Sequence, residues 1–100
     1  MHWLWTWSGK CFGYKDGQDL WTHDGTHVGR FHNDEVFGLN GRYLGEVRNE
    51  KFLITHRGKK SWMKGSVGAW GKRGAYTKYS DYTGYAMLGG HEDFPAPETF

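Results

Sequence analysis

The segment LWTHDGTHVGR, at residues 20–30, decides the fold, because it is one complete copy of a pattern that the chain repeats. The pattern is two apolar residues, a glycine four positions after the second of them, and then an apolar residue followed by another glycine. Successive copies of the first glycine are 16, 16 and 17 residues apart. The repeat positions are Leu4, Trp5, Gly9, Phe12 and Gly13; Leu20, Trp21, Gly25, Val28 and Gly29; Val36, Phe37, Gly41, Leu44 and Gly45; and Leu53, Ile54 and Gly58.

This period of 16 residues predicts β-hairpins. Two packed helices with their turn need about 33 residues, whereas two strands of about five residues and two tight turns fit the shorter period. The dipeptides Asp24-Gly25 and Asn40-Gly41 are strong hairpin signals, because both central residues of a type I′ turn adopt positive φ. The sequence therefore predicts an all-β fold, in which four tandem hairpins over residues 1–62 form a small flower or barrel-like meander.

The turns also predict which residues face each other across the strands. Turns of two residues would give pairs with a large apolar residue on both strands: Trp5 with Phe12, Trp21 with Val28, and Phe37 with Leu44. On the opposite face they would give pairs with a glycine on one strand: Leu4 with Gly13, Leu20 with Gly29, and Val36 with Gly45. A glycine in such a pair predicts the close approach of another backbone or ring. A turn of three residues with a bulge would shift this register.

The two faces of the hairpins have different expected partners. One face is expected to meet the other hairpins around a common axis. The second is expected to be covered by the C-terminal half of the chain or by another subunit, because both faces are partly apolar.

Three runs of the chain and its ending resemble a known family. They are WSGKCFG at residues 7–13, LWTHDGTHVGR at residues 20–30, VFGLNGRYLG at residues 36–45, and Glu92-Asp93-Phe94. They resemble the repeats and the tail of the four-fold β-flower family of small bacterial proteins. The resemblance implies an all-β flower of four hairpins and brings no catalytic residue with it. The fourth copy departs from the pattern, because Ser61 and Trp62 replace its apolar residue and glycine.

The composition predicts one domain over residues 1–100. Aromatic residues, 18% of the chain, supply much of the area that a thin core can bury. The single cysteine, Cys11, excludes an internal disulfide and is expected to be a small strand residue. The first residues lack a basic region followed by a long apolar run, and no segment has the ~20 apolar residues that would span a membrane. The sequence therefore predicts a cytoplasmic protein with no membrane partner.

Residues 57–79 carry an excess of positive charge without one acidic residue. Basic groups and aromatic rings alternate there with glycines, which recur every three residues from Gly65 to Gly74. Such a segment could follow a phosphate backbone and stack on bases, which predicts a nucleic-acid or polyanion site. The alternatives are a solvated connector over residues 63–79 and a cover for the exposed hairpin face. The candidate site residues are Arg57, Lys59, Lys60, Lys64, Lys72, Arg73, Lys78, Trp62 and Trp70.

Residues 80–100 are expected to contain a strand and an extended tail. Aromatic residues between positions 76 and 88 favour the strand, and Pro95 and Pro97 restrict their predecessors to extended backbone. A tail that carries Phe94 and Phe100 is expected to lie on a sheet edge, to insert into a neighbouring molecule, or to fray.

The chain contains no catalytic signature, so the sequence favours a non-enzymatic scaffold. The favoured function is a protein-interaction or homo-oligomer assembly module, whose partner is a second copy or another protein. Polyanion binding through residues 57–79 is the first alternative, and carbohydrate binding by exposed Trp3, Trp5, Trp7 and Trp21 is the second. No cofactor or metal site is predicted, because the expected register places His23 and His27 on opposite faces.

Overall fold

The computed structural model describes residues 1–100 and confirms the predicted all-β fold. Its regular elements are eight strands and two short 3-10 helices. The strands are β1 (His2–Thr6), β2 (Cys11–Asp16), β3 (Asp19–Thr22), β4 (His27–His32), β5 (Glu35–Gly38), β6 (Tyr43–Arg48), β7 (Phe52–His56) and β8 (His91–Asp93), and the 3-10 helices are η1 (Arg57–Lys59) and η2 (Pro97–Thr99). Both helices have only three residues, so the structure contains no helix that could span a membrane.

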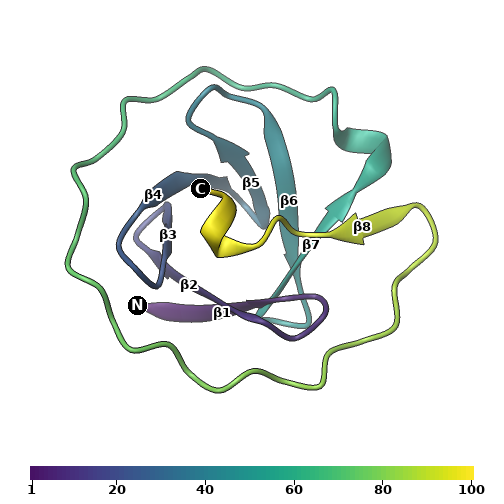
Figure 1. Ribbon diagram of the computed structural model, residues 1–100. Coiled ribbons are helices and arrows are strands. Elements are labelled where there is room, and N and C mark those ends of the chain that lie inside the picture. The colour runs from purple at the N-terminus through teal and green to yellow at the C-terminus, as the bar shows by residue number, and fades with distance from the viewer.

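The strands follow one another around a closed sheet (Figure 1). Each strand from β1 to β7 pairs with the next, and β1 pairs in parallel with the start of β7 to close the ring. β8 pairs antiparallel with the following residues of β7, Ile54–His56. The molecule is a flat disc that measures 36 × 32 × 22 Å.

Three tight hairpins, β1–β2, β3–β4 and β5–β6, are called hairpins 1, 2 and 3 below. Each turn has three residues rather than the predicted two, and its glycine, Gly9, Gly25 or Gly41, has a φ of +100°, +94° or +84°. In hairpin 1 the N–H of Thr6 donates to the carbonyl of Lys10. Only the glycine has positive φ in these turns, so the predicted type I′ geometry is wrong and a single left-handed glycine suffices.

The register of the hairpins is partly as predicted. The apolar residue faces the glycine in three confirmed pairs: Leu4 with Gly13, Leu20 with Gly29, and Val36 with Gly45. The other predicted pairs are wrong, because a β-bulge in each hairpin shifts the partner by one residue. The observed pairs are Trp5 with Cys11, Trp21 with His27, and Phe37 with Tyr43.

The bulge explains how the core forms. It leaves Phe12 and Val28 without a cross-strand partner, and both side chains are buried in the main core cluster. The full cluster is Leu4, Phe12, Leu20, Val28, Phe31, Val36, Leu53 and Phe94, with Leu44 and Val47 packed against it. A second cluster consists of Trp5, Trp7, Cys11, Phe52 and Ile54, with Trp3 packed against it. Cys11 is thus a buried strand residue, and burial raises the pKa of its thiol.

The strand glycines permit close approach, as predicted. A Cβ on Gly13 or Gly29 would collide with the backbone of the next hairpin, and one on Gly45 would meet the ring of Phe94. Phe94 enters the core from the C-terminal tail, and the yellow tail with η2 lies across the middle of the disc in Figure 1.

The fourth copy of the repeat differs from the prediction. Two expected strands are not formed: the return strand directly after Gly58, and the strand between residues 76 and 88. Instead, η1 follows β7, and the next strand along the chain is β8. Residues 63–88, called the belt below, run around the outer edge of the disc (Figure 1). After the belt, the chain returns to the sheet as β8, which pairs with β7.

Candidate functional site

Backbone hydrogen bonds attach the belt to the turns of the three hairpins. Belt N–H groups donate to turn carbonyls in six bonds: Lys64 to Gly41, Val67 to Leu39, Arg73 to Gly25, Tyr76 to His23, Tyr82 to Gly9, and Tyr85 to Trp7. The attachment therefore repeats every nine residues along the belt, and it meets the hairpins in reverse order. At hairpin 2, the N–H of Trp70 donates to Nδ1 of His27.

The turn glycines are where the belt comes closest. A Cβ on Gly9, Gly25 or Gly41 would collide with the backbone carbonyl of Tyr82, Arg73 or Lys64. The same glycine thus supplies the left-handed turn and the space for the belt, which explains why the repeat keeps it.

Aromatic side chains of the belt cover the outer face of hairpin 1 and β7, in line with one interpretation of the sequence. Tyr79 packs edge-on against Trp3 at 5.0 Å between ring centroids, and Tyr82 against Trp5 at 4.8 Å. Tyr85 packs against Trp7 at 4.7 Å. The three tyrosines, called the tyrosine row below, remain 56%, 43% and 48% exposed.

The tryptophans considered for sugar stacking lie beneath the belt. Trp5, Trp7 and Trp21 are buried, and Trp3 is half-buried between Tyr76 and Tyr79. The guanidinium of Arg73 stacks on Trp21, 3.8 Å from its centroid. These four rings are therefore covered by the chain's own side chains. The exposed tryptophans are Trp62 and Trp70.

The predicted cationic residues are spread from η1 through Lys60 to the belt, and most already have a partner. Arg57 and Lys60 lie beside Glu92, and Arg73 pairs with Asp16 at 2.8 Å. Lys64 lies over the ring of Phe37. Lys72 and Lys78 form no ion pair. Because the other cationic residues contact different partners, the predicted site residues do not form one basic cluster.

Lys59 is the most strongly held of these cations. Its ammonium lies 2.8 Å from a carboxylate oxygen of Glu35 and 2.9 Å from one of Glu46. The hydrogen bonds to Glu35 and then Glu46 raise the pKa of Lys59. Burial alone would raise the pKa of Glu46, but hydrogen bonds from Lys59 and from Tyr43 lower it. Burial raises the pKa of Tyr43, whose hydroxyl donates to Glu46.

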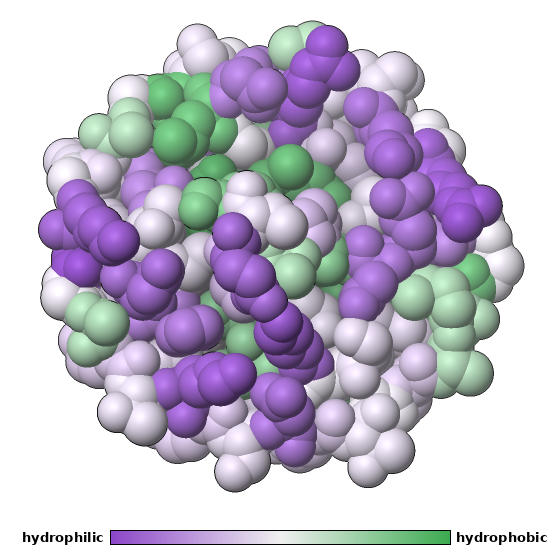
Figure 2. Space-filling view, viewed as in Figure 1, coloured by the Kyte–Doolittle hydropathy of each residue, from purple (hydrophilic) through white to green (hydrophobic).

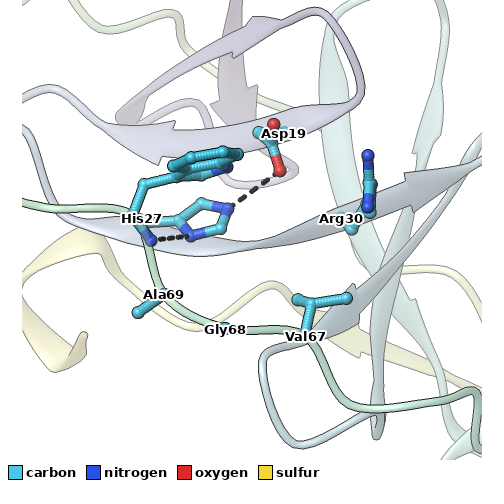
Figure 3. A pocket seen from close by; sticks show the side chains of 7 residues that line it. Asp19, His27, Arg30, Val67, Gly68 and Ala69 are labelled. Carbon is cyan, nitrogen blue, oxygen red and sulfur yellow. Dashed lines mark hydrogen bonds and ion pairs between the residues drawn. The ribbon is translucent and has the colours of Figure 1, made fainter.

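A cavity of about 460 Å³ lies between hairpin 2 and the belt (Figure 3). It is lined by Asp19, His27 and Arg30 of the hairpin and by residues 67–70 of the belt. The imidazole of His27 is buried, and its Nε2 lies 3.0 Å from Oδ1 of Asp19. In Figure 3, Arg30 stands across the opening from His27, and Gly68 and Ala69 form the lower edge.

The hydrogen bonds of His27 define its tautomer. Nδ1 accepts from the Trp70 N–H, so the proton of the neutral ring is on Nε2 and is donated to Asp19. The contact between His27 and Asp19 is thus a hydrogen bond rather than an ion pair. Arg30 is exposed and has no ion-pair partner.

Sequence reasoning did not find Asp19 and Arg30, and it placed His27 on the wrong face. Asp19 and Arg30 face each other across β3 and β4, but a single Asp and a single Arg in strands give no functional pattern. No group of three or more His, Cys, Asp or Glu side chains is close enough to hold a metal ion.

Comparison with protein-family models, with curated proteins and with solved structures gave no match for this chain.

The disc surface is not uniformly polar. Figure 2 shows bands of hydrophilic residues across the face seen in Figure 1, with hydrophobic side chains exposed near the middle and at the upper left. Of the eleven exposed large hydrophobic residues, all but Met1 and Phe100 lie between Trp62 and Leu88. The belt is therefore the main apolar surface of the protein.

Proposed function

We propose that the chain is a non-enzymatic scaffold that assembles with a second copy of itself through the tyrosine row. The observation that carries this proposal is the arrangement of Tyr79, Tyr82 and Tyr85. They recur every three residues, each is about half exposed, and each packs on a ring of the sheet.

A row of this kind has the properties of an interface. Tyrosine is enriched in the buried centres of protein interfaces, because it supplies a large amphipathic area with few rotatable bonds. Packing on Trp3, Trp5 and Trp7 fixes the rings before a partner arrives, so little side-chain entropy is lost on binding. Two hydrogen bonds hold the backbone next to the rings, from Trp5 Nε1 to the carbonyl of Ser80, which follows Tyr79, and from Trp7 Nε1 to the carbonyl of Ala86, which follows Tyr85.

The non-enzymatic part of the proposal draws support from His27. It is the histidine with a carboxylate partner inside a cavity, which is the usual setting of a general base. Both of its ring nitrogens are already hydrogen bonded, to Trp70 and to Asp19, so it has no free lone pair with which to remove a proton from a substrate.

The two alternatives have less support. A polyanion site at residues 57–79 would have to release Arg57, Lys59, Lys60 and Arg73 from acidic partners. Sugar stacking on the four tryptophans would require the belt to leave them. The resemblance to the four-fold β-flower family stays a prediction and adds no residue to this proposal.

The proposal is tested by light scattering coupled to size-exclusion chromatography over a range of protein concentrations. We expect a mass above that of the monomer, rising with concentration. The double variant Tyr79→Ser, Tyr85→Ser is expected to shift the mass back to the monomer. Met63→Ser, which removes an exposed apolar side chain outside the row, is the control and is expected to behave as the wild type. A strict monomer at every concentration would overturn the assembly function.

A further inference from the structure

The three hairpins contain equivalent recesses beneath the belt. Each recess is built on a pair of residues that face each other across the strands of one hairpin: Trp3 and Tyr14, Asp19 and Arg30, and Glu35 and Glu46. On the return strand, two residues after the turn glycine, lies Cys11, His27 or Tyr43. The recesses share a backbone but differ in chemistry, so each can be compared with the other two.

In hairpin 1 the chain fills its own recess with aromatic rings. Tyr79 packs on Trp3 at 5.0 Å between centroids, and Tyr76 packs on Tyr14 at 5.4 Å. The neutral aromatic recess thus holds neutral aromatic side chains.

In hairpin 3 the chain fills the recess with a cation. The ammonium of Lys59 lies between Glu35 and Glu46, at 2.8 and 2.9 Å. The recess with two carboxylates thus holds a primary ammonium group. In both cases the occupant complements the cross-strand pair.

The recess of hairpin 2 is the cavity of about 460 Å³, and no side chain of the protein fills it (Figure 3). The belt residues that pass beside it include Gly68 and Ala69, whose side chains are too short to enter. A Cβ on Gly68 would meet no atom within 4 Å. The volume lies within the range of about 300–1,000 Å³ that is typical of small-molecule sites.

The polar groups of this recess carry two opposite charges. Oδ1 of Asp19 accepts from His27, while Oδ2 has no donor in the protein. The guanidinium of Arg30, on the opposite strand, has no anionic partner, and residues directly opposite on paired strands have Cβ atoms about 5 Å apart. Asp19 and Arg30 are nevertheless not paired with each other within 4.0 Å.

We propose that the recess of hairpin 2 is a binding site for a free α-amino acid. Its ammonium group is recognised by Asp19 and its carboxylate by Arg30, and its side chain lies against Val67 and Trp70 of the belt. A zwitterion complements an Asp and Arg pair in the way that Lys59 complements two glutamates. His27 positions Asp19 and, through Trp70, fixes the belt at the edge of the site. This proposal goes beyond the assembly function and does not depend on it.

The test is an NMR titration of the ¹⁵N-labelled protein with a panel of free L-α-amino acids. Acetate, n-propylammonium chloride and glucose serve as probes that carry only an anion, only a cation or only hydroxyl groups. We expect at least one amino acid to give saturable shifts of the amide signals of Arg30 and residues 67–70. Its Kd is expected to be at least about tenfold lower than those of the three probes, because each of them leaves a charged group without its charge-assisted bond.

Two substitutions separate the charges, and a third closes the site. Asp19→Asn keeps an acceptor for His27 but removes the charge, and Arg30→Gln removes the guanidinium; each is expected to weaken binding at least about tenfold. Val67→Trp enlarges a side chain that lines the cavity and stands below Arg30 in Figure 3, and it is expected to abolish binding while the melting temperature is kept. Arg42→Gln is the matched control, because Arg42 is exposed and its side chain has no ion-pair partner.

The outcomes that would overturn the proposal are distinct from a failure to fold. No saturable shift at residues 67–70 with any amino acid of the panel would overturn it, as would equal affinity for glucose or acetate. Unchanged affinity in folded Arg30→Gln or Val67→Trp protein would do the same, even if Asp19→Asn destabilised the fold.

Discussion

The amide of Tyr82 donates a hydrogen bond of 2.7 Å to the carbonyl of Gly9, and the α-carbon of Gly9 lies against the carbonyl of Tyr82. The same reciprocal contact joins Arg73 to Gly25 and Lys64 to Gly41. Three glycines thus connect the hairpin repeat to the belt, and the stability of this connection can be measured at each of them.

Gly25→Ala is expected to destabilise the protein more than a left-handed alanine alone would. A left-handed non-glycine residue costs about 1–2 kcal/mol, and here the added methyl would also collide with the Arg73 carbonyl. Gly17→Ala is the control, because Gly17 also has positive φ but has no atom within 4 Å of the added Cβ. Chemical denaturation should show a larger loss in the free energy of unfolding for Gly25→Ala. Equal losses would contradict the contact between belt and turn.

Amide hydrogen exchange along the belt is expected to show protection at seven residues, which are spaced three apart except for a gap at position 79. The N–H groups of Lys64, Val67 and Trp70 donate to the hairpins, and the pattern continues at Arg73, Tyr76, Tyr82 and Tyr85. The amides between them have no such bonds, so they should exchange faster. The measurement is residue-resolved exchange by NMR at neutral pH. Uniformly fast exchange over residues 63–88 would instead indicate a solvated connector.

The Lys59 network is expected to make stability depend on pH in the acid range. The folded-state pKa of Glu46 is lowered, so its contribution is present above the pKa of an unfolded glutamate, about 4.3, and is lost as the pH falls through the folded-state pKa. Glu46→Gln should therefore lower the free energy of unfolding at neutral pH by about 1 kcal/mol and flatten its decline at acid pH. Glu50→Gln, at an exposed glutamate without an ion pair, is the control. Parallel pH profiles for wild type and Glu46→Gln would refute this.

Phe94→Ala is expected to cost about 3–5 kcal/mol of folding stability, because a fully buried aromatic ring is removed from the main core cluster. Phe100→Ala, at a residue that packs on the same Phe12 ring but is 39% exposed, should cost only about 1 kcal/mol. Thermal and urea denaturation of both variants give the comparison. A similar small loss for both would mean that the tail is not part of the core.

The sequence carried the information for the hairpins but not for the bulge. The period of 16 residues and the turn glycines predicted the three tight hairpins, because turn conformation depends on a few local residues. The positions of these turns also predicted the pairing of Leu20 with Gly29. Trp21 faces His27 rather than Val28, because the return strand contains one extra residue at the bulge. The apolar pattern could not predict that extra residue, since the pattern fits either register. That single shift places His27 beside Asp19.

The belt was harder to predict for a different physical reason. Its contacts use backbone N–H groups and carbonyls, which every residue except proline can provide, so the side chains carry only a weak signal. That signal is a period of nine residues, with Lys64, Arg73 and Tyr82 in one equivalent position. Recognising it required the positions of the turns to which the belt attaches.

The belt also determines the order in which the chain can complete its fold. Lys64 is close in sequence to its acceptor Gly41, Arg73 is farther from Gly25, and Tyr82 is farthest from Gly9. Because the entropy lost on closing a loop grows with its length, we expect attachment to begin at hairpin 3 and to end at hairpin 1. During synthesis the three hairpins leave the ribosome before the belt does, and Phe94 follows it. Hairpin 1, the first part of the chain to be synthesised, is therefore the last to receive its outer contacts. A cleavage anywhere in the belt would leave β8 and the core residue Phe94 without a covalent link to strands β1–β7.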